Sequence, residues 1–293
     1  MIDLDLKRLR FELGPSILIV GAGGMLARAF QVVLADLGLE ATCLARDRLD
    51  ITDRTAVERV ISSGPWSAVI NAAAWTNVDA AEADEPGATR VNGLGVEHLR
   101  DACYDADALL VTFGTDYVFS GNATRPYRVD EPLAPVNAYG RSKAAGERAL
   151  ANYLEFLHVR TSWLYAPWGN NFVRTIARRL GEAPVVRVVN DQRGRPTSAE
   201  HLARTTLALL SRHARGIVHA TDGGSCTWFE LACQIARLTG AATPVEPCAT
   251  KDFPRPARRP AYSVLEISQT EAIVGPMPDW RANLADVVTR LEP

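Results

Sequence analysis

The stretch SILIVGAGGMLARAF, residues 16–30, decides the fold of this chain. Its first five residues form a short run rich in branched apolar side chains, which is typical of a strand buried on both faces. The glycine-rich turn GAGG, residues 21–24, follows at once, and a helix is predicted for residues 25–37. A strand, a glycine turn and a helix in direct succession predict the first unit of a parallel α/β sheet.

The alternation of strands and helices continues along the first half of the chain. Further strands are predicted at residues 41–45, 69–73 and 108–113, with helices notably at 54–61 and 93–104. Because crossovers between parallel strands are right-handed, this order predicts a Rossmann-type, doubly wound parallel sheet. Beyond residue 160 the alternation loosens, and we predict strands at 185–189 and 216–220 and helices at 171–180, 199–210 and 228–238.

This organisation predicts two regions. Residues 1–160 would form mainly an NAD(P)-binding Rossmann domain, and residues 161–293 mainly a smaller substrate-binding α/β region, with segments at about 190–215 returning to the first domain. The proline-rich segment 243–260 is predicted to be an irregular loop on the substrate side. Its Arg255, Arg258 and Arg259 leave two interpretations open, contact with phosphate or a solvated basic loop.

Composition excludes several classes of function. The chain has 293 residues, 47% hydrophobic and 23% charged, with a net charge of −2, so no nucleic-acid or anionic-membrane surface is expected. No apolar run approaches the ~20 residues that span a bilayer, and the charged N-terminus lacks the features of a secretory signal. The five cysteines match neither a zinc ribbon nor a disulfide framework. We therefore expect a cytoplasmic protein without a metal site defined by cysteine.

The glycine turn predicts a dinucleotide site. Gly21 and Gly24 let the backbone turn tightly and approach a pyrophosphate, and the following helix offers free N–H groups at its start. Met25 and Leu26 stand at that helix start and are expected to line the cofactor. The alternative is a purely structural turn, but the strand before it and the helix after it favour phosphate binding.

The end of the second predicted strand should lie beside the adenosine ribose. Arg46 stands there and favours NADPH, although NADH remains possible. Asp50 and Ile51 follow. For Asp50 two interpretations stay open: it accepts a hydrogen bond from the adenine amino group, or it caps the helix that begins near Arg54.

Tyr139 and Lys143, in AYGRSK, predict a reduction. Residues four apart on a helix share one face, and lysine is scarce here, with three lysines against 29 arginines. A phenol titrates near ~10, and a neighbouring ammonium and a helix N-terminus favour its phenolate. We therefore expect the pKa of Tyr139 to be lowered, and Lys143 to bond the nicotinamide ribose. Thr115, at a strand end, would be the third donor; the alternative is a surface tyrosine with a solvated lysine.

Further motifs run through nearly the whole chain. Among them are NAAA at 71–74, TDYVF at 115–119, RTSW at 160–163, NFV at 171–173 and PDWR at 278–281. With these motifs the chain resembles the extended short-chain dehydrogenase/reductases, and within them the dTDP-4-dehydrorhamnose reductase family. The resemblance implies reduction of the 4-keto group of dTDP-4-dehydro-6-deoxy-L-mannose to dTDP-L-rhamnose by NADPH or NADH.

The resemblance also implies roles for particular residues. Thr115, Tyr139 and Lys143 would be the catalytic trio, and Tyr139 and Lys143 would also contact the cofactor. Val78, Tyr117 and Trp163 would line the sugar-nucleotide pocket, although from the residues alone Val78 and Trp163 are ordinary packing residues. The backbone of Asn71, Ala72 and Ala73 would pass beneath the cofactor.

Tyr117 separates neighbouring activities. Related dehydratases carry glutamate at this position, so elimination would lack its base. Two alternatives stay open: a reductase of another nucleotide-linked 4-keto-6-deoxyhexose, or a non-catalytic dinucleotide-binding regulatory subunit. Some relatives are magnesium-dependent dimers, so both Mg²⁺ and the choice between monomer and homodimer stay open.

Three positions depart from the family pattern. Ala27 replaces a third glycine and is expected to loosen packing or crowd the pyrophosphate. Gly114 replaces a serine and would remove a hydrogen bond in the pocket. Tyr262 replaces an asparagine and would alter contacts to the nucleotide or sugar. No role is predicted for residues 1–15 before the first strand.

Overall fold

A parallel sheet forms the centre of the molecule. The computed structural model describes residues 4–151 and 153–292. Within them the large sheet has six strands in the order β10-β5-β4-β3-β1-β2, and every neighbouring pair is parallel. The strands are β1 (Ile17–Val20), β2 (Ala41–Leu44), β3 (Ala68–Asn71), β4 (Leu109–Thr115), β5 (Phe156–Thr161) and β10 (Gly216–His219). The predicted Rossmann-type sheet is confirmed.

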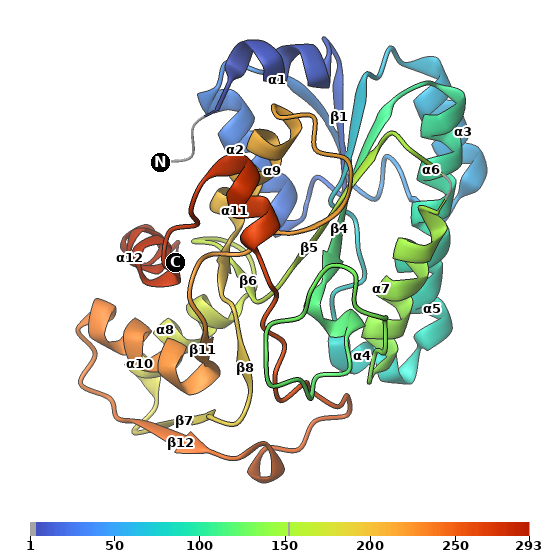
Figure 1. The fold of residues 1–293 in the computed structure, drawn as a ribbon. Helices are drawn as coiled ribbons and strands as arrows, with labels where there is room; N and C mark the ends of the chain where they lie inside the picture. The colour runs from blue at the N-terminus through green and yellow to red at the C-terminus, as the bar shows by residue number, and fades with distance from the viewer. Residues whose placement is uncertain (1–3, 152, 293) are drawn as a thin grey trace.

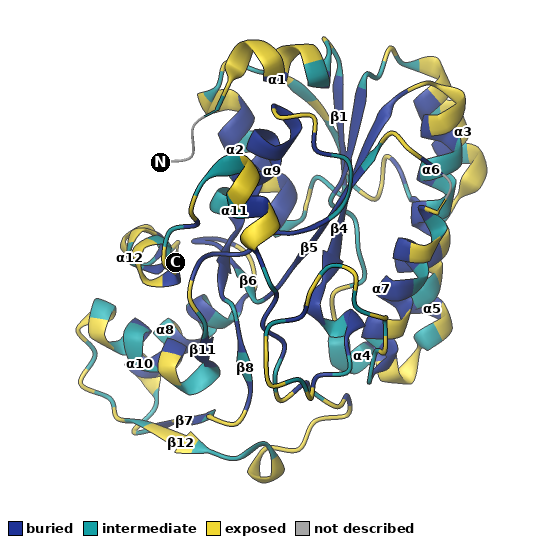
Figure 2. Cartoon of the chain, viewed as in Figure 1, coloured by how far each residue is buried: buried dark blue, intermediate teal, exposed yellow. Residues whose placement is uncertain are grey.

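Helices cover both faces of this sheet (Figure 1). On β1, Ile17 and Ile19 pack with α1 (Leu6–Leu13), α2 (Met25–Asp36) and α9 (Ala199–Leu210), whereas Leu18 and Val20 pack with α3 (Arg54–Ser63) and α6 (Gly95–Asp105). Consecutive side chains of a strand point to opposite faces, so an unbroken apolar run is required where both faces are covered. Figure 2 shows the strands buried along most of their length.

Further helices and turns surround the sheet. They are α4 (Val78–Ala83), α5 (Glu85–Thr89), a π-helical turn (Arg90–Leu94), a 3₁₀ turn (Asp116–Val118), α7 (Ala138–Ala149) and α11 (Ser268–Val274). The sheet order reverses between β1 and β3, with β2 on one side and β4 on the other. In doubly wound sheets ligands bind at this switch point, outside the carboxyl ends of the strands.

A smaller region lies beside the carboxyl edge (Figure 1). It has its own apolar cluster, which includes Val186, Leu231 and Trp280. Its elements are β6 (Leu164–Tyr165), α8 (Phe172–Glu182), β7 (Val186–Val189), β8 (Arg193–Gly194), β9 (Thr197–Ser198), β11 (Cys226–Thr227), α10 (Trp228–Thr239), β12 (Val245–Cys248), a 3₁₀ turn (Thr250–Asp252) and α12 (Trp280–Thr289). The boundaries of two domains stay a prediction; α9 packs on α2, and the edge strand β10 lies just beyond the predicted returning segment.

The strands differ from the prediction in several places: β5 and the short strands β6, β8, β9 and β11 were not predicted, and two other differences have a clear local reason. Strand β3 ends at Asn71 rather than at residue 73, because the Asn71 side-chain oxygen accepts a hydrogen bond from Ala73 N at 3.0 Å and turns the chain. The segment 243–260 is not wholly irregular, since β12 pairs in parallel with β7. Pro247 is tolerated in β12 because this strand has a single neighbour in its two-stranded sheet.

The residues before the first strand form a structural element. Asp5 caps α1 by accepting from Arg8 N, and Leu9 and Leu13, four apart, are completely buried. Glu12 is paired with Arg215 at 3.0 Å and with His213 at 2.6 Å. The lead segment therefore ties the start of the chain to the turn between α9 and β10.

Replacement of Leu13 by alanine should destabilise the protein by about 2–5 kcal/mol, because a fully buried leucine leaves a cavity when truncated. Chemical denaturation would measure this change in the free energy of unfolding. Phe11→Ala on the same helix is the control, since Phe11 is 80% exposed. Equal stability of the two variants would contradict a structural role for α1.

None of the helices within residues 4–151 and 153–292 is both long and apolar enough to cross a membrane.

Candidate active site

The glycine turn after β1 lies against the turn after β3. Gly21 has φ of +80°, and a Cβ added to it would lie only 2.5 Å from Ala73 N. Only glycine accommodates both this backbone conformation and this close approach. Gly24 is the N-cap of α2 and provides no side-chain cap, so the first N–H groups of the helix are open to an anion.

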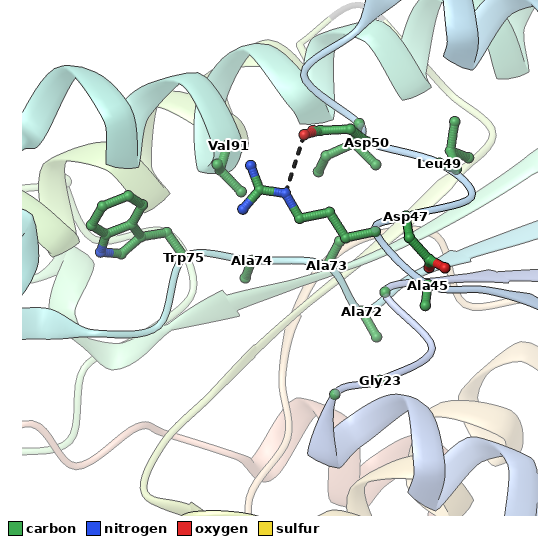
Figure 3. Close-up of a pocket in the computed structure, with 14 residues that line it drawn as sticks. Gly23, Ala45, Asp47, Leu49, Asp50, Ala72, Ala73, Ala74, Trp75 and Val91 are labelled. Atoms are coloured by element: carbon green, nitrogen blue, oxygen red, sulfur yellow. Dashed lines mark hydrogen bonds and ion pairs between the residues drawn. The ribbon is translucent and has the colours of Figure 1, made fainter.

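A cavity of about 470 Å³ opens above these two turns (Figure 3). Seven of the predicted cofactor residues line it: Gly21, Gly24, Arg46, Asp50, Ile51, Ala72 and Ala73. The sequence prediction missed Gly23, Ala45, Asp47, Leu49, Ala74, Trp75 and Val91, which line it too. Most of these are neighbours of predicted residues along the chain. Val91 comes from the π-helical turn, and no local pattern points to it.

Arg46 and Asp50, which both line this cavity, form an ion pair. Arg46 Nε lies 3.1 Å from Asp50 Oδ2, and the Arg46 side chain is 81% exposed (Figure 3). The other carboxylate oxygen of Asp50 accepts from the backbone and hydroxyl of Thr52. The helix α3 is capped by Asp53 instead, so the capping interpretation of Asp50 is wrong. Hydrogen bonding by Thr52 lowers the pKa of Asp50, which keeps a negative charge beside Arg46.

Five predicted cofactor residues do not line the cavity: Tyr139 and Lys143, which are described below, and Met25, Leu26 and Asn71. Asn71 is buried and holds the turn at Ala73, so its role is to shape the floor of the cavity. Leu26 is buried in the core, and the Met25 carbonyl accepts from Trp168 Nε1. At the start of α2 these two residues can offer an anion only their backbone N–H groups. Ala27 is also completely buried in the core, so its methyl group packs between α2 and the sheet and does not crowd the turn.

Thr115, Tyr139 and Lys143 converge at the carboxyl end of β4. Thr115 is the last residue of β4, and its hydroxyl is hydrogen-bonded with the Tyr139 side chain. Tyr139 is in the first turn of α7, which Asn137 caps. One turn later Lys143 Nζ donates to the Phe113 carbonyl at 2.6 Å, and only 9% of this residue is exposed. The interpretation of a solvated lysine is therefore wrong.

The charges at this site differ from the prediction. Burial and the neighbouring Asp116 carboxylate raise the pKa of Tyr139 to about 12, and the hydrogen bond with Thr115 only partly opposes them. The expected lowering of this pKa by Lys143 is thus wrong for the structure described. Burial lowers the pKa of Lys143 to about 8 and raises that of Asp116 to about 7. A tyrosine that holds its proton is suited to act as an acid.

Tyr117 lies beside Tyr139. The two rings meet edge to face, with centroids 5.9 Å apart and planes at 79°. Val78 is the first residue of α4, and the next residue, Asp79, pairs with Arg259 at 2.9 Å. The Arg259 and Asp79 charges both act on the Tyr117 hydroxyl, which places the start of α4 close to Tyr117. Tyr117 and the start of α4 therefore lie together on the side of Tyr139 where the sugar contacts are predicted.

Trp163 lies farther into the smaller region. It follows β5 with an unusual positive φ of 47°, and its indole stacks on Trp228 with centroids 3.5 Å apart. A Cβ at Gly194 would collide with the same indole, so the ring is held between Trp228 and Gly194. Contact of Trp163 with a substrate remains a prediction, since packing explains most of its surroundings.

The basic segment near residue 258 is anchored at Arg259, whereas Arg255 and Arg258 are exposed to solvent. Arg259 is paired with Asp79, and its side chain is only 18% exposed. The Arg258 carbonyl accepts from Asn137 Nδ2 at 2.8 Å, next to the start of α7. Arg255 is the outer member, 54% exposed and 3.9 Å from Asp79. The segment is thus attached to both α4 and α7, and phosphate contact remains a prediction.

The two remaining departures from the family pattern, Gly114 and Tyr262, are closely packed against neighbouring residues. A Cβ at Gly114 would lie 2.5 Å from His158 Nε2, so the space of the usual serine is filled by a buried histidine of β5. The expectation that Gly114 removes a hydrogen bond from the pocket stays a prediction. Tyr262 packs against the cluster that contains Phe119 and Tyr127, and its backbone N–H donates to Gly121 O.

Within the described part of the chain, no group of three or more histidine, cysteine, aspartate or glutamate side chains is arranged to hold a metal ion.

Known proteins share this fold and these motifs. Residues 15–292 match the family model described as the RmlD substrate binding domain. A dTDP-4-dehydrorhamnose reductase of Streptomyces griseus is 43% identical over 281 residues, covering 93% of this chain and 92% of that protein. A dTDP-4-keto-6-deoxy-D-glucose reductase of Streptomyces niveus is 39% identical, covering 91% of this chain and 94% of that protein.

Solved structures agree with the sequence comparison. A dTDP-4-dehydrorhamnose reductase from Bacillus anthracis, in complex with NADP, is 33% identical to this chain and has a TM-score of 0.91. The match covers 94% of this chain and 99% of that structure.

Proposed function

Because the chain belongs to the RmlD substrate binding domain family, that of the dTDP-4-dehydrorhamnose reductases, we propose that it reduces the 4-keto group of dTDP-4-dehydro-L-rhamnose to give dTDP-L-rhamnose. The observation that carries this proposal is the convergence of Thr115, Tyr139 and Lys143 at the end of β4. The trio lies at the same carboxyl edge of the sheet as the cavity above the glycine turn.

The cavity fits a phosphorylated dinucleotide. Gly21 allows the backbone to approach a pyrophosphate, the uncapped start of α2 offers N–H groups, and Ala72 and Ala73 leave room beneath a ring. Arg46 at the adenosine end can pair with a 2′-phosphate, which favours NADPH over NADH. The solved relative from Bacillus anthracis binds NADP.

The chain's residues would hold the carbonyl and supply its proton. Bound NADPH supplies the hydride. Tyr139 gives its proton to the sugar O4 as negative charge develops there, and its high pKa keeps that proton in place beforehand. Thr115 holds the carbonyl oxygen by a hydrogen bond, and Lys143 orients the nicotinamide ribose. Tyr117 and Val78 are the proposed sugar contacts, with Trp163 on the opposite side.

A different 4-keto-6-deoxyhexose is the second candidate substrate. The relative from Streptomyces niveus is a dTDP-4-keto-6-deoxy-D-glucose reductase of nearly equal similarity. A non-catalytic subunit is less favoured, because a buried lysine next to a buried tyrosine costs stability that only chemistry requires. We propose a cytoplasmic enzyme that is a monomer or a homodimer.

The test is loss of NADPH absorbance in the presence of purified protein. It would use enzymatically prepared dTDP-4-dehydro-L-rhamnose, with the unepimerised dTDP-4-keto-6-deoxy-D-glucose in a parallel reaction. Turnover of the first sugar supports the proposal, and turnover of the second alone assigns the other deoxysugar. Dinucleotide binding without oxidation by either sugar would favour the regulatory subunit.

Arg46→Ala should raise the KM for NADPH by about tenfold or more and leave the KM for NADH within about twofold. The reason is that the variant loses one charged hydrogen bond to the 2′-phosphate, and such a bond contributes roughly 1.5–3 kcal/mol. Steady-state kinetics with each dinucleotide would measure it. Arg48→Ala, a second exposed arginine of the same turn, is the control. An equal effect of Arg46→Ala on both dinucleotides would contradict the role of Arg46.

A further inference from the structure

A buried group of charges lies behind the catalytic trio. Tyr139, Lys143 and Glu147 follow one another at intervals of four on α7, so they share the face of the helix that packs on the sheet. The first two carry the proposed chemistry. Glu147 has no place in that mechanism, yet its side chain is only 5% exposed. A buried carboxylate without a role in catalysis requires an explanation.

Arg160 of β5 holds the Glu147 carboxylate from below. Its Nη2 and Nε donate to the two oxygens at 2.5 and 2.8 Å, and its own side chain is 3% exposed. Planar, two-point pairs of this kind fix geometry as well as charge. Arg160 also lies over the Phe119 ring at 5.0 Å and donates to the Val129 carbonyl. It therefore joins α7 to the segment that follows Thr115.

The absence of a side chain at Gly114 leaves the space in which Arg160 can reach Glu147. A side chain there would collide with His158 Nε2 at 2.5 Å and with the Arg160 stem at 2.9 Å. His158 Nδ1 is bonded with Thr112 Oγ1 at 2.7 Å, and Nε2 lies 3.5 Å from Glu147. This chain thus combines a glycine on β4 with a histidine and an arginine on β5 beneath α7.

Glu147 and Lys143 are electrostatically coupled. Burial lowers the pKa of Lys143, and the Glu147 charge acts in the opposite direction. The other groups that face this lysine do not offer a negative charge. His158 on β5 has a lowered pKa and is neutral at working pH, Arg160 is a cation, and β4 provides only the Phe113 carbonyl. The Glu147 carboxylate has a pKa of about 2 and stays ionised.

We propose that Glu147 is a positioning residue of the reductase, which acts through Lys143: held by Arg160, its carboxylate is the counter-charge that keeps the Lys143 ammonium beside the catalytic hydroxyls. This inference rests on the proposed function. Lys143 must carry its proton to bind the ribose, so activity is lost as pH rises through the pKa of Lys143. Removing the counter-charge moves this loss to lower pH.

The test compares Glu147→Gln with wild type by two readouts, kcat/KM for the keto-sugar and the Kd for NADPH, from pH 6 to 9.5. In Glu147→Gln we expect kcat/KM to fall, and the Kd for NADPH to rise, at a pH about one unit lower than in wild type. This shift corresponds to a tenfold decrease in the proton affinity of Lys143. Glu147→Asp keeps the charge and should restore most of the wild-type profile. A merely structural role would lower activity equally at every pH.

Glu85→Gln is the matched control. Glu85 forms a similar two-point ion pair with Arg141 of the same helix, at 2.8 and 2.7 Å, but on the exposed surface. Its removal should leave both pH profiles unchanged. Profiles of Glu147→Gln that superimpose on those of wild type would overturn the proposal.

Removal of one partner from a buried pair is commonly strongly destabilising, whereas replacement of both by apolar residues is often neutral. If Glu147→Gln does not fold, Glu147→Met/Arg160→Met is the second variant; because the Arg160 cation is removed as well, we expect a smaller shift in the same direction, and no shift would overturn the proposal. A wild-type protein that binds NADPH but turns over no keto-sugar would refute the proposed function alone. The pH dependence of NADPH binding would still test Glu147.

Discussion

Tyr139→Phe is expected to lower kcat by about 10²–10⁴-fold, the usual contribution of a positioned general acid. The phenylalanine ring fills the same space, but no proton is available for the sugar O4 as the hydride arrives. Binding of NADPH should remain within about threefold, since the lost hydroxyl is one hydrogen bond among many. Stopped-flow or steady-state NADPH absorbance and a fluorescence titration would measure the two quantities.

The control for this variant is Tyr104→Phe. Tyr104 is 70% exposed near the end of α6, and its ring contacts Tyr153, so loss of its hydroxyl should change neither kcat nor binding. Near-normal turnover by Tyr139→Phe would show that the proton comes from another group. Asp116, whose pKa is about 7 and which accepts from the Thr115 hydroxyl, would then be the first alternative.

Gly21→Ala is expected to weaken NADPH binding by about 100-fold or more. Its Cβ would lie 2.5 Å from Ala73 N and 2.6 Å from Ala73 Cα, both backbone atoms that cannot rotate away. The positive φ of +80° adds strain of order 1–3 kcal/mol for a residue other than glycine. The turn must therefore move away from the position in which its N–H groups meet the pyrophosphate. Isothermal titration with NADPH would measure the loss.

Gly216→Ala separates strain from collision. Gly216 also has φ of +80°, but a Cβ there meets no atom within 4 Å. This variant should lose a similar amount of stability and retain NADPH binding. If Gly21→Ala bound NADPH as tightly as Gly216→Ala, the glycine turn would not be the pyrophosphate site.

Local signals predicted the cofactor half of the molecule well. The run at residues 16–30 contains the strand, the turn and the helix in one continuous stretch, so no distant contact is needed to identify it. Strand β3 was predicted to end two residues too late. It ends at Asn71 because of a side-chain hydrogen bond, which the apolar composition of the segment does not reveal. The helix α1 was missed, although Asp5 and the spacing of Leu9 and Leu13 are ordinary helix signals.

Tertiary contacts explain why strand β5 and the pKa of Tyr139 were not predicted correctly. Strand β5 is central in the sheet, but His158 and Arg160 interrupt its apolar pattern and resemble a solvated segment. They are buried because Glu147 on α7 pairs with Arg160, a contact that no sequence spacing reveals. The pKa of Tyr139 was predicted in the wrong direction for the same reason, since the burial of Tyr139, which is the main cause of its raised pKa, depends on tertiary packing, and the Asp116 charge adds to it.

Transfer of deuterium from NADPH labelled at the reactive position of nicotinamide C4 to dTDP-4-dehydro-L-rhamnose tests the central claim most directly. The account predicts dTDP-L-rhamnose with one deuterium at the sugar C4, formed by wild type and slower by about 10²–10⁴-fold with Tyr139→Phe. A protein that binds NADPH yet leaves this sugar unlabelled and unreduced would contradict the assignment of the reaction.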